Sequence, residues 1–122
     1  MEEVDMESIL TSTKKLLNLS EEQTDFDPDI IVHINRAFSR LRKLGVGPAE
    51  GFSISDVTAM WDDYMDDDPN LPDVKTYVYL KTKIVFDPPL SSTVLASMKE
   101  EIKELEWTLN VDAENADLDA ED

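Results

Sequence analysis

The stretch that decides the fold is VKTYVYLKTKIVFDPPLSSTVLASMKEEIKELEWTLNV, residues 74–111, in which two regular segments meet at Asp87-Pro88-Pro89. Two successive prolines neither continue a helix nor donate hydrogen bonds in a sheet, so the chain must turn there. Ser91 or Ser92 then offers an N-cap, and a periodic run predicts a helix that ends at Leu109. Its apolar side chains fall within one arc of the helix: Val94, Leu95, Met98, Ile102, Leu105 and Leu109.

Trp107 does not follow this pattern. It projects from the charged side of the expected helix, roughly opposite Leu105. A side chain of that size on a polar face is covered either by another element of its own domain or by a partner, and the residues leave both readings open.

The segment before the prolines, residues 74–86, fits two structures. Its many β-branched residues and its alternation slightly favour a strand. Its length, the plausible helix start at Leu71-Pro72-Asp73 and the lack of a second strong strand to pair with it favour a helix.

Upstream, the apolar spacing predicts a short helix over residues 6–17, with Lys14 and Lys15 pointing outward. A second helix is expected to begin at Asp27-Pro28, to run to Leu44 and to stop at Gly45. Residues 45–51 are expected to form a loop and residues 52–54 a short strand or extended arm. Residues 55–64 fit either a hairpin or one helical turn.

The composition is strongly acidic, with 28 acidic and 11 basic residues and a net charge of −17. Such a surface repels nucleic acid and argues against sequence-specific DNA binding. The simple explanation of the charge is solubility. The two more specific explanations are a channel surface along which DNA slides without binding, and mimicry of DNA. The absence of cysteine excludes disulfides and thiolate metal sites, and no apolar run reaches membrane-spanning length.

The last eleven residues are expected to form a tail separate from the folded part. They contain few apolar side chains and no basic one, so we expect a helical domain over residues 1–111 and a disordered acidic tail over residues 112–122. Its acids are Asp112, Glu114, Asp117, Asp119, Glu121 and Asp122. The acidic N-terminus has no signal-peptide character, so we expect a soluble protein made in the cytoplasm.

Four stretches in order carry a resemblance to a known family: LRKLGVGPAEGFSI at 41–54, the Trp-x-Asp-aromatic cluster at Trp61–Tyr64, VKTYVYLKTKIVFDPP, and KEEIKELEWTLNV. They resemble the head–tail connector (adaptor) family of tailed bacteriophages and prophages, and the likeness spans roughly Ile9 to Val111. The resemblance implies that residues 74–86 are helical. We therefore expect an all-α fold, a small bundle of about four helices with an irregular or extended arm and the acidic tail.

The same resemblance implies a structural virion protein that joins the portal vertex of the phage head to the tail. It implies a ring that matches the roughly twelve-fold symmetry of the portal and extends the DNA channel, formed by subunits that are monomeric in isolation. The implied partners are the portal protein, the next head-completion or tail connector protein and further copies of the chain, with DNA passing unbound. Assembly in the bacterial host cytoplasm, no enzyme activity, no cofactor and no membrane contact are expected. The alternative from another class is an acidic DNA-mimic inhibitor of a prophage.

The densest basic cluster is formed by Arg36, Arg40 and Lys43, whose spacing places them on one stripe of the second expected helix. One interpretation is pairing with acids of the same chain, each pair contributing ~0–1 kcal/mol. The other is pairing between subunits, in which the stripe meets an acidic loop of the next copy, such as Asp62 to Asp68. Both stay open at this point.

Further contact candidates are aromatic or apolar. The arm and the end of the last helix are expected to touch partners through Phe52, Ile54, Trp61, Tyr64 and Trp107. His33, the single histidine, has no supporting catalytic motif and is assigned a structural role. The aspartates at 62–68 lack the glycine and terminal glutamate of a calcium loop, so no metal site is expected.

Overall fold

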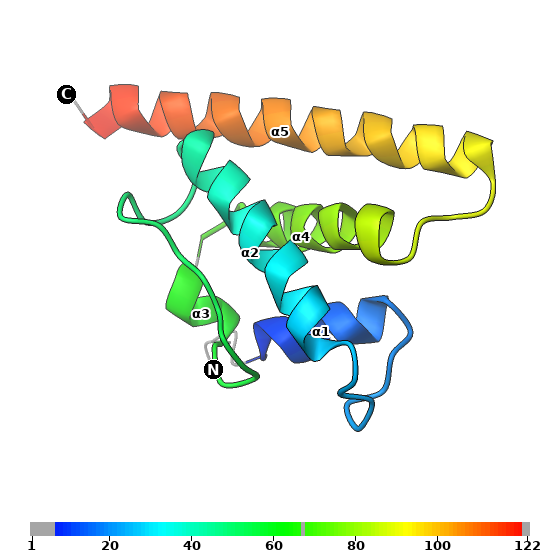
Figure 1. The fold of residues 1–122 in the computed structure, drawn as a ribbon. Coiled ribbons are helices and arrows are strands. Elements are labelled where there is room, and N and C mark those ends of the chain that lie inside the picture. Colours follow the sequence, from blue (N-terminus) through cyan, green and yellow to red (C-terminus); the bar gives the residue numbers. More distant parts are fainter. Residues whose placement is uncertain (1–6, 67, 121–122) are drawn as a thin grey trace.

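A computed structural model describes residues 7–66 and 68–120, the last four by their backbone only. Within these residues the chain forms five helices and no strand (Figure 1). They are α1 (Ile9–Leu16), α2 (Asp27–Lys43), α3 (Trp61–Tyr64), α4 (Leu71–Phe86) and α5 (Ser92–Ala120). The predicted all-α bundle is confirmed, with the short α3 added to the four main helices.

The helix α4 lies at the centre and contacts α1, α2 and α5. Pro72 stands in its first turn, where the missing N–H costs nothing. Its buried side chains occupy most of its circumference, as expected of a helix packed on several sides: Leu71, Val74, Tyr77, Val78, Leu80 and Thr82. The helical reading of residues 74–86 is therefore confirmed, because the apolar residues that suggested a strand serve different neighbouring helices.

The boundaries of α2 follow the sequence signals. Asp27 and Pro28 open the helix, and Leu44 is its C-cap. Gly45 follows with φ +86°, a left-handed conformation that glycine adopts without a Cβ penalty. The face toward the core is formed by Ile30, Ile34, Ala37, Phe38 and Leu41, all buried.

One expectation for α1 is wrong: Lys14 points inward. Its side chain is only 2% exposed, and its Nζ lies 2.9 Å from Asp27 Oδ1. The same ammonium donates a hydrogen bond to the Glu21 carbonyl at 3.3 Å. A lysine is buried in this way only when its charge is paired, and here the carboxylate at the start of α2 provides that pairing. The helix also begins at Ile9, later than expected, with Ser8 as its N-cap.

The arm between α2 and α4 packs against α2 through backbone and side-chain contacts. Asn35 Nδ2 donates to the Ile54 carbonyl at 2.9 Å, and the Ile54 N–H donates to Asn35 Oδ1 at 2.7 Å. Trp61 to Tyr64 form one helical turn, so of the two alternatives for this segment the helical turn is confirmed and the hairpin is wrong. Ser8 and Met60 form an isolated antiparallel bridge that ties the arm to the start of α1.

The helix α5 is longer than the sequence predicts. It continues to Ala120, so the expected end at Leu109 is wrong. Near the end of α2 it meets the body through the Asn110 Nδ2 hydrogen bond to the Leu44 carbonyl at 3.0 Å and through Ala113, which lies next to Gly45. Residues 112–120, predicted to be disordered, belong to the helical end of α5, which projects beyond the end of α2 (Figure 1). Glu121 and Asp122 lie outside the described residues.

Candidate assembly surface

The basic stripe predicted on α2 lies on the surface. Arg36, Arg40 and Lys43 are all exposed, on the side of α2 away from its core face. Because each residue is about one turn from the next, the three charges form a continuous line along the helix. The structure therefore brings these predicted residues together as one surface feature.

Arg40 is the member of this stripe that pairs within the chain. Its Nη2 lies 3.5 Å from Glu106 Oε1 on α5, with the Arg40 side chain 49% exposed. The other oxygen of that carboxylate, Oε2, accepts a hydrogen bond from the Tyr77 hydroxyl of α4 at 2.6 Å. Glu106 therefore connects three helices. Its half-exposed ion pair with Arg40 contributes ~0–1 kcal/mol to the stability of the fold.

Burial determines the behaviour of the Tyr77 hydroxyl. Desolvation raises the pKa of Tyr77 far above its ordinary value, and the hydrogen bond to Glu106 raises it further. The phenol therefore remains protonated, and a donor to Glu106, at pH values where an exposed tyrosine would already ionise.

Arg36 and Lys43 differ from Arg40. Within the part of the chain that the structure describes, neither has an ion-pair partner. The interpretation by internal pairing holds for Arg40, while the two flanking cations are available to another molecule.

Trp107 lies on the outer side of α5 and is 70% exposed. Of the two readings of this residue, cover by its own domain is therefore wrong. An exposed indole of this size is unusual on a polar helix face and is a typical anchor of protein interfaces. Trp107 is the predicted aromatic contact residue that the structure leaves accessible.

The four predicted contact residues of the arm lie inward instead. Ile54, Trp61 and Tyr64 are buried, and Phe52 is half-buried. Phe52 and Tyr64 both pack on Phe38 of α2, with ring centroids 5.1 Å and 4.6 Å away. In this conformation the four residues form the core beneath the arm, and they reach a partner only if the arm leaves the body.

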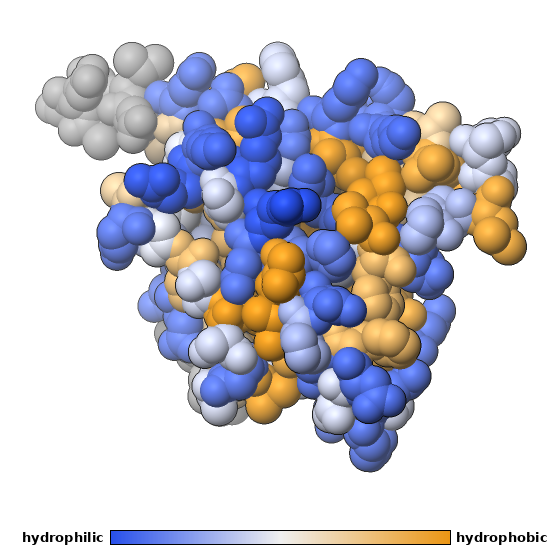
Figure 2. Space-filling model, in the orientation of Figure 1, coloured by the Kyte–Doolittle hydropathy of each residue, from blue (hydrophilic) through white to orange (hydrophobic). Residues whose placement is uncertain are grey.

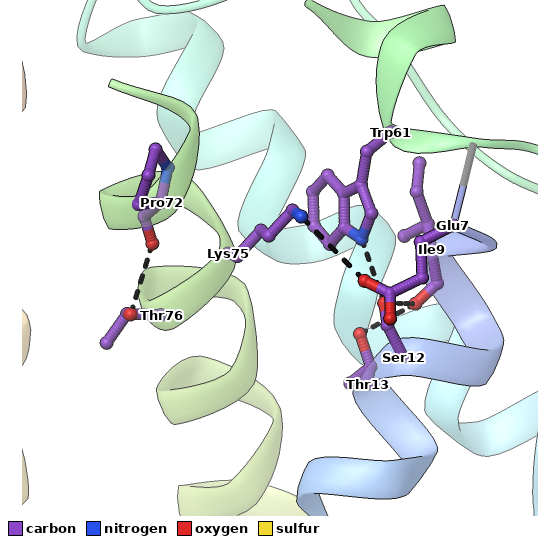
Figure 3. Close-up of polar contacts among 8 residues, drawn as sticks. All are labelled: Glu7, Ile9, Ser12, Thr13, Trp61, Pro72, Lys75 and Thr76. Carbon is purple, nitrogen blue, oxygen red and sulfur yellow. Dashed lines mark hydrogen bonds and ion pairs between the residues drawn. The ribbon is translucent and has the colours of Figure 1, made fainter. Parts of the chain in front are cut away.

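Trp61 is held by contacts from two further helices (Figure 3). Its Nε1 donates to Ser12 Oγ of α1 at 2.8 Å. Lys75 of α4 lies over the indole, with Nζ 5.7 Å from the ring centroid, and also pairs with Glu7 at 3.7 Å. This network fixes the short α3 against α1 and α4.

The remaining polar candidates have structural surroundings. His33 is partly buried on α2. Asp63 Oδ2 accepts the Met60 N–H and Asp68 Oδ1 accepts the Asn70 N–H, each at 2.8 Å; Asp67 lies outside the described residues. No group of three or more potential metal ligands occurs among the described residues. Nor does any helix in that part of the chain have the length and apolarity needed to cross a membrane.

Two residues of this surface were not predicted from the sequence. Glu106 and Tyr77 join the helices, yet Glu106 looks like an ordinary solvated acid and Tyr77 like an apolar core residue. The available signal was position: Glu106 lies at the edge of the apolar arc that contains Leu105 and Leu109. An acid at that edge faces a neighbouring helix rather than open solvent.

Comparisons with known proteins place this fold and surface in context. Residues 9–116 match the family described as phage connector protein. Neither the curated proteins nor the solved structures gave a match. The family match covers the described helices α1 to α4 and most of α5, including every predicted contact residue. The chain therefore belongs to the phage connector protein family.

Proposed function

We propose that this protein joins the portal vertex of a phage head to the tail, as one subunit of a ring around the DNA channel. The observation that carries the proposal is the family match over residues 9–116. Its partners are the portal protein, the next head-completion or tail connector protein, and further copies of itself. The role is structural, within the virion, after assembly in the host cytoplasm.

The charge of the chain supports a channel role. With a net charge of −17, a ring of such subunits repels the phosphate backbone. DNA then passes through the channel without being held, because the net field of the ring opposes the charge of the phosphates.

The exposed residues of α2 and α5 support contacts with other subunits. A ring built from identical subunits uses two different, complementary patches of each copy. Arg36 and Lys43 supply uncommitted positive charge, Arg40 adds to it, and Trp107 supplies an apolar anchor. Phe52, Ile54, Trp61 and Tyr64 contribute contacts only where binding opens the arm, at the cost of their packing.

Co-sedimentation with the portal from the same genome tests this proposal. We expect the wild-type protein to sediment with the portal, and Trp107→Ala or Arg36→Glu to reduce the bound fraction. Lys15→Glu, which reverses an exposed charge on α1, is the matched control and should bind normally.

Two results would count against the proposal. If the wild-type protein stays in the supernatant, the portal is not its partner, and competition with DNA for a DNA-processing enzyme would then test the DNA-mimic alternative. If Lys15→Glu weakens binding as much as Arg36→Glu does, the effect comes from overall charge and not from the stripe on α2.

A further inference from the structure

We propose that a basic face on α2 and α5 binds the acidic C-terminal segment, residues 114–122, of a second copy of this chain. The basic face consists of Arg36, Arg40, Lys43, Lys99 and Lys103. The inference deepens the proposed ring assembly, on which it rests, by naming the two surfaces that meet between neighbouring subunits.

The five cations share one side of the molecule. Arg40 reaches across to Glu106, which fixes where α2 meets α5. Lys103 and Lys99 lie one and two turns before Glu106 and therefore project from the same side of α5. All five side chains are exposed.

This face concentrates positive charge in an acidic protein. It holds five of the 11 basic residues of the chain. Glu106 is engaged by Arg40 and Tyr77, and among the described residues the other four cations form no ion pair. The face therefore offers uncompensated cations to an acidic ligand, which steers association and sets its orientation.

The C-terminal segment has the complementary charge. After Ala113, which packs against the core near Gly45, the sequence contains five acids and no base: Glu114, Asp117, Asp119, Glu121 and Asp122. Acids at a helix C-terminus lie at the negative end of the helix dipole and destabilise the last turns. Cations from outside the helix would relieve this repulsion.

The direction of α5 favours a second copy over the same chain. The helix continues without a break to Ala120 and carries its end past the end of α2 (Figure 1). At about 1.5 Å per residue, that end lies roughly 10 Å beyond Ala113. Lys99 and Lys103 lie in the opposite direction, toward the start of α5, so a straight helix cannot return its own acids to these two lysines.

The acidic loop at residues 62–68 is a poorer occupant. The carboxylates of Asp63 and Asp68 each accept a backbone N–H within the loop at 2.8 Å. Binding to a cation would compete with these hydrogen bonds, which hold the turns on either side of α3 in place. The C-terminal segment is therefore the better counterpart of the basic face.

Disulfide trapping tests the contact. Because the chain contains no cysteine, any disulfide must form between the introduced residues. Two single-cysteine variants, Lys103→Cys and Ala116→Cys, are mixed with the portal and oxidised. Glu101→Cys replaces Lys103→Cys in the control, since Glu101 projects from the other side of α5. A disulfide forms only when the two Cα atoms come within about 7 Å, so we expect a mixed dimer from the first pair and none from the control.

Imaging the same samples by negative-stain electron microscopy separates the possible outcomes. A ring on the portal without the mixed dimer overturns the tail contact and leaves the connector role intact. A mixed dimer without a portal-bound ring supports the contact and overturns the portal role; the loss of both overturns both. A chain carrying both cysteines that closes an internal bridge would show that its own tail occupies the face, which also overturns the inference.

Charge exchange provides a second measurement. Lys99→Glu with Lys103→Glu should abolish the ring on the portal. Adding Glu114→Lys, Asp117→Lys and Asp119→Lys to the same chain should restore it, because the two surfaces are again of opposite sign. Reversal of the basic face without any loss of the ring would contradict the proposal.

Discussion

Glu106 joins α2, α4 and α5 through its contacts with Arg40 and Tyr77. The hydrogen bond from Tyr77 to its carboxylate, at 2.6 Å, is short and partly buried. We expect Tyr77→Phe to lower the free energy of unfolding by about 1.5–3 kcal/mol, the usual contribution of a hydrogen bond to a charged group. Urea denaturation measures this, with Tyr79→Phe on the same helix as the control; equal losses in the two variants would contradict the role of Glu106.

Tyr64 should respond in the opposite way. Its hydroxyl is buried and has no hydrogen-bond partner among the described residues. Removing an unsatisfied buried hydroxyl relieves a desolvation cost, so Tyr64→Phe should leave stability at neutral pH unchanged or raise it by up to about 1 kcal/mol. A loss of stability in urea denaturation would indicate that the hydroxyl has a stabilising contact.

The two tyrosines also predict how stability depends on pH. Burial raises the pKa of both Tyr64 and Tyr77 above the ordinary 10.0. The unfolded chain therefore loses these protons at lower pH than the folded chain does. The contribution of these two groups to folding stability is fully present below pH about 10 and is lost as the pH rises further. Urea midpoints between pH 7 and pH 11 should show this decline, and it should be smaller in Tyr64→Phe; an unchanged slope would contradict the assignment.

Among the elements, α5 is where sequence and structure differ most. The sequence predicts a helix that ends where its apolar arc ends, whereas the structure extends it to Ala120. The acidic run after Ala113 has no face to bury, so its helix rests on propagation from the packed part of α5. This dependence on the preceding turns is not visible in local composition, which indicated a disordered tail.

Hydrogen exchange tests the stability of that extension. We expect the amides of residues 102–113 to be protected in the isolated protein, because these residues pack on α2 and α4. Amides after Ala113 should exchange much faster, since the acids there oppose the helix dipole. Equal protection along the whole helix would contradict this expectation.

The other helices show what local sequence can determine. Proline in the first turn marks the starts of α2 and α4, and Gly45 marks the end of α2. The inward turn of Lys14 depends on Asp27, which belongs to the next helix, so no local pattern predicts it. The same holds for Trp61 and Tyr64, whose burial is decided by packing against Ser12 and Phe38.

At the scale of the whole molecule, the candidate surface was predictable only in part. The stripe on α2 and the outward Trp107 follow from helical spacing, and the structure places both on the surface. Among the residues that the structure describes, only Arg40 of the stripe is paired, because α5 brings Glu106 next to it. Helical spacing along α2 cannot predict where α5 crosses. The membership of the chain in the phage connector protein family rests on a match that includes these residues.

The proposed ring of subunits on the portal can be observed directly. Its most direct test is to mix the purified protein with the portal from the same genome and image the mixture by negative-stain electron microscopy. We predict an added ring of density at the narrow end of the portal, continuing its channel. Portals without added density beside free monomers, at protein concentrations well above those of the portal, would contradict the connector role.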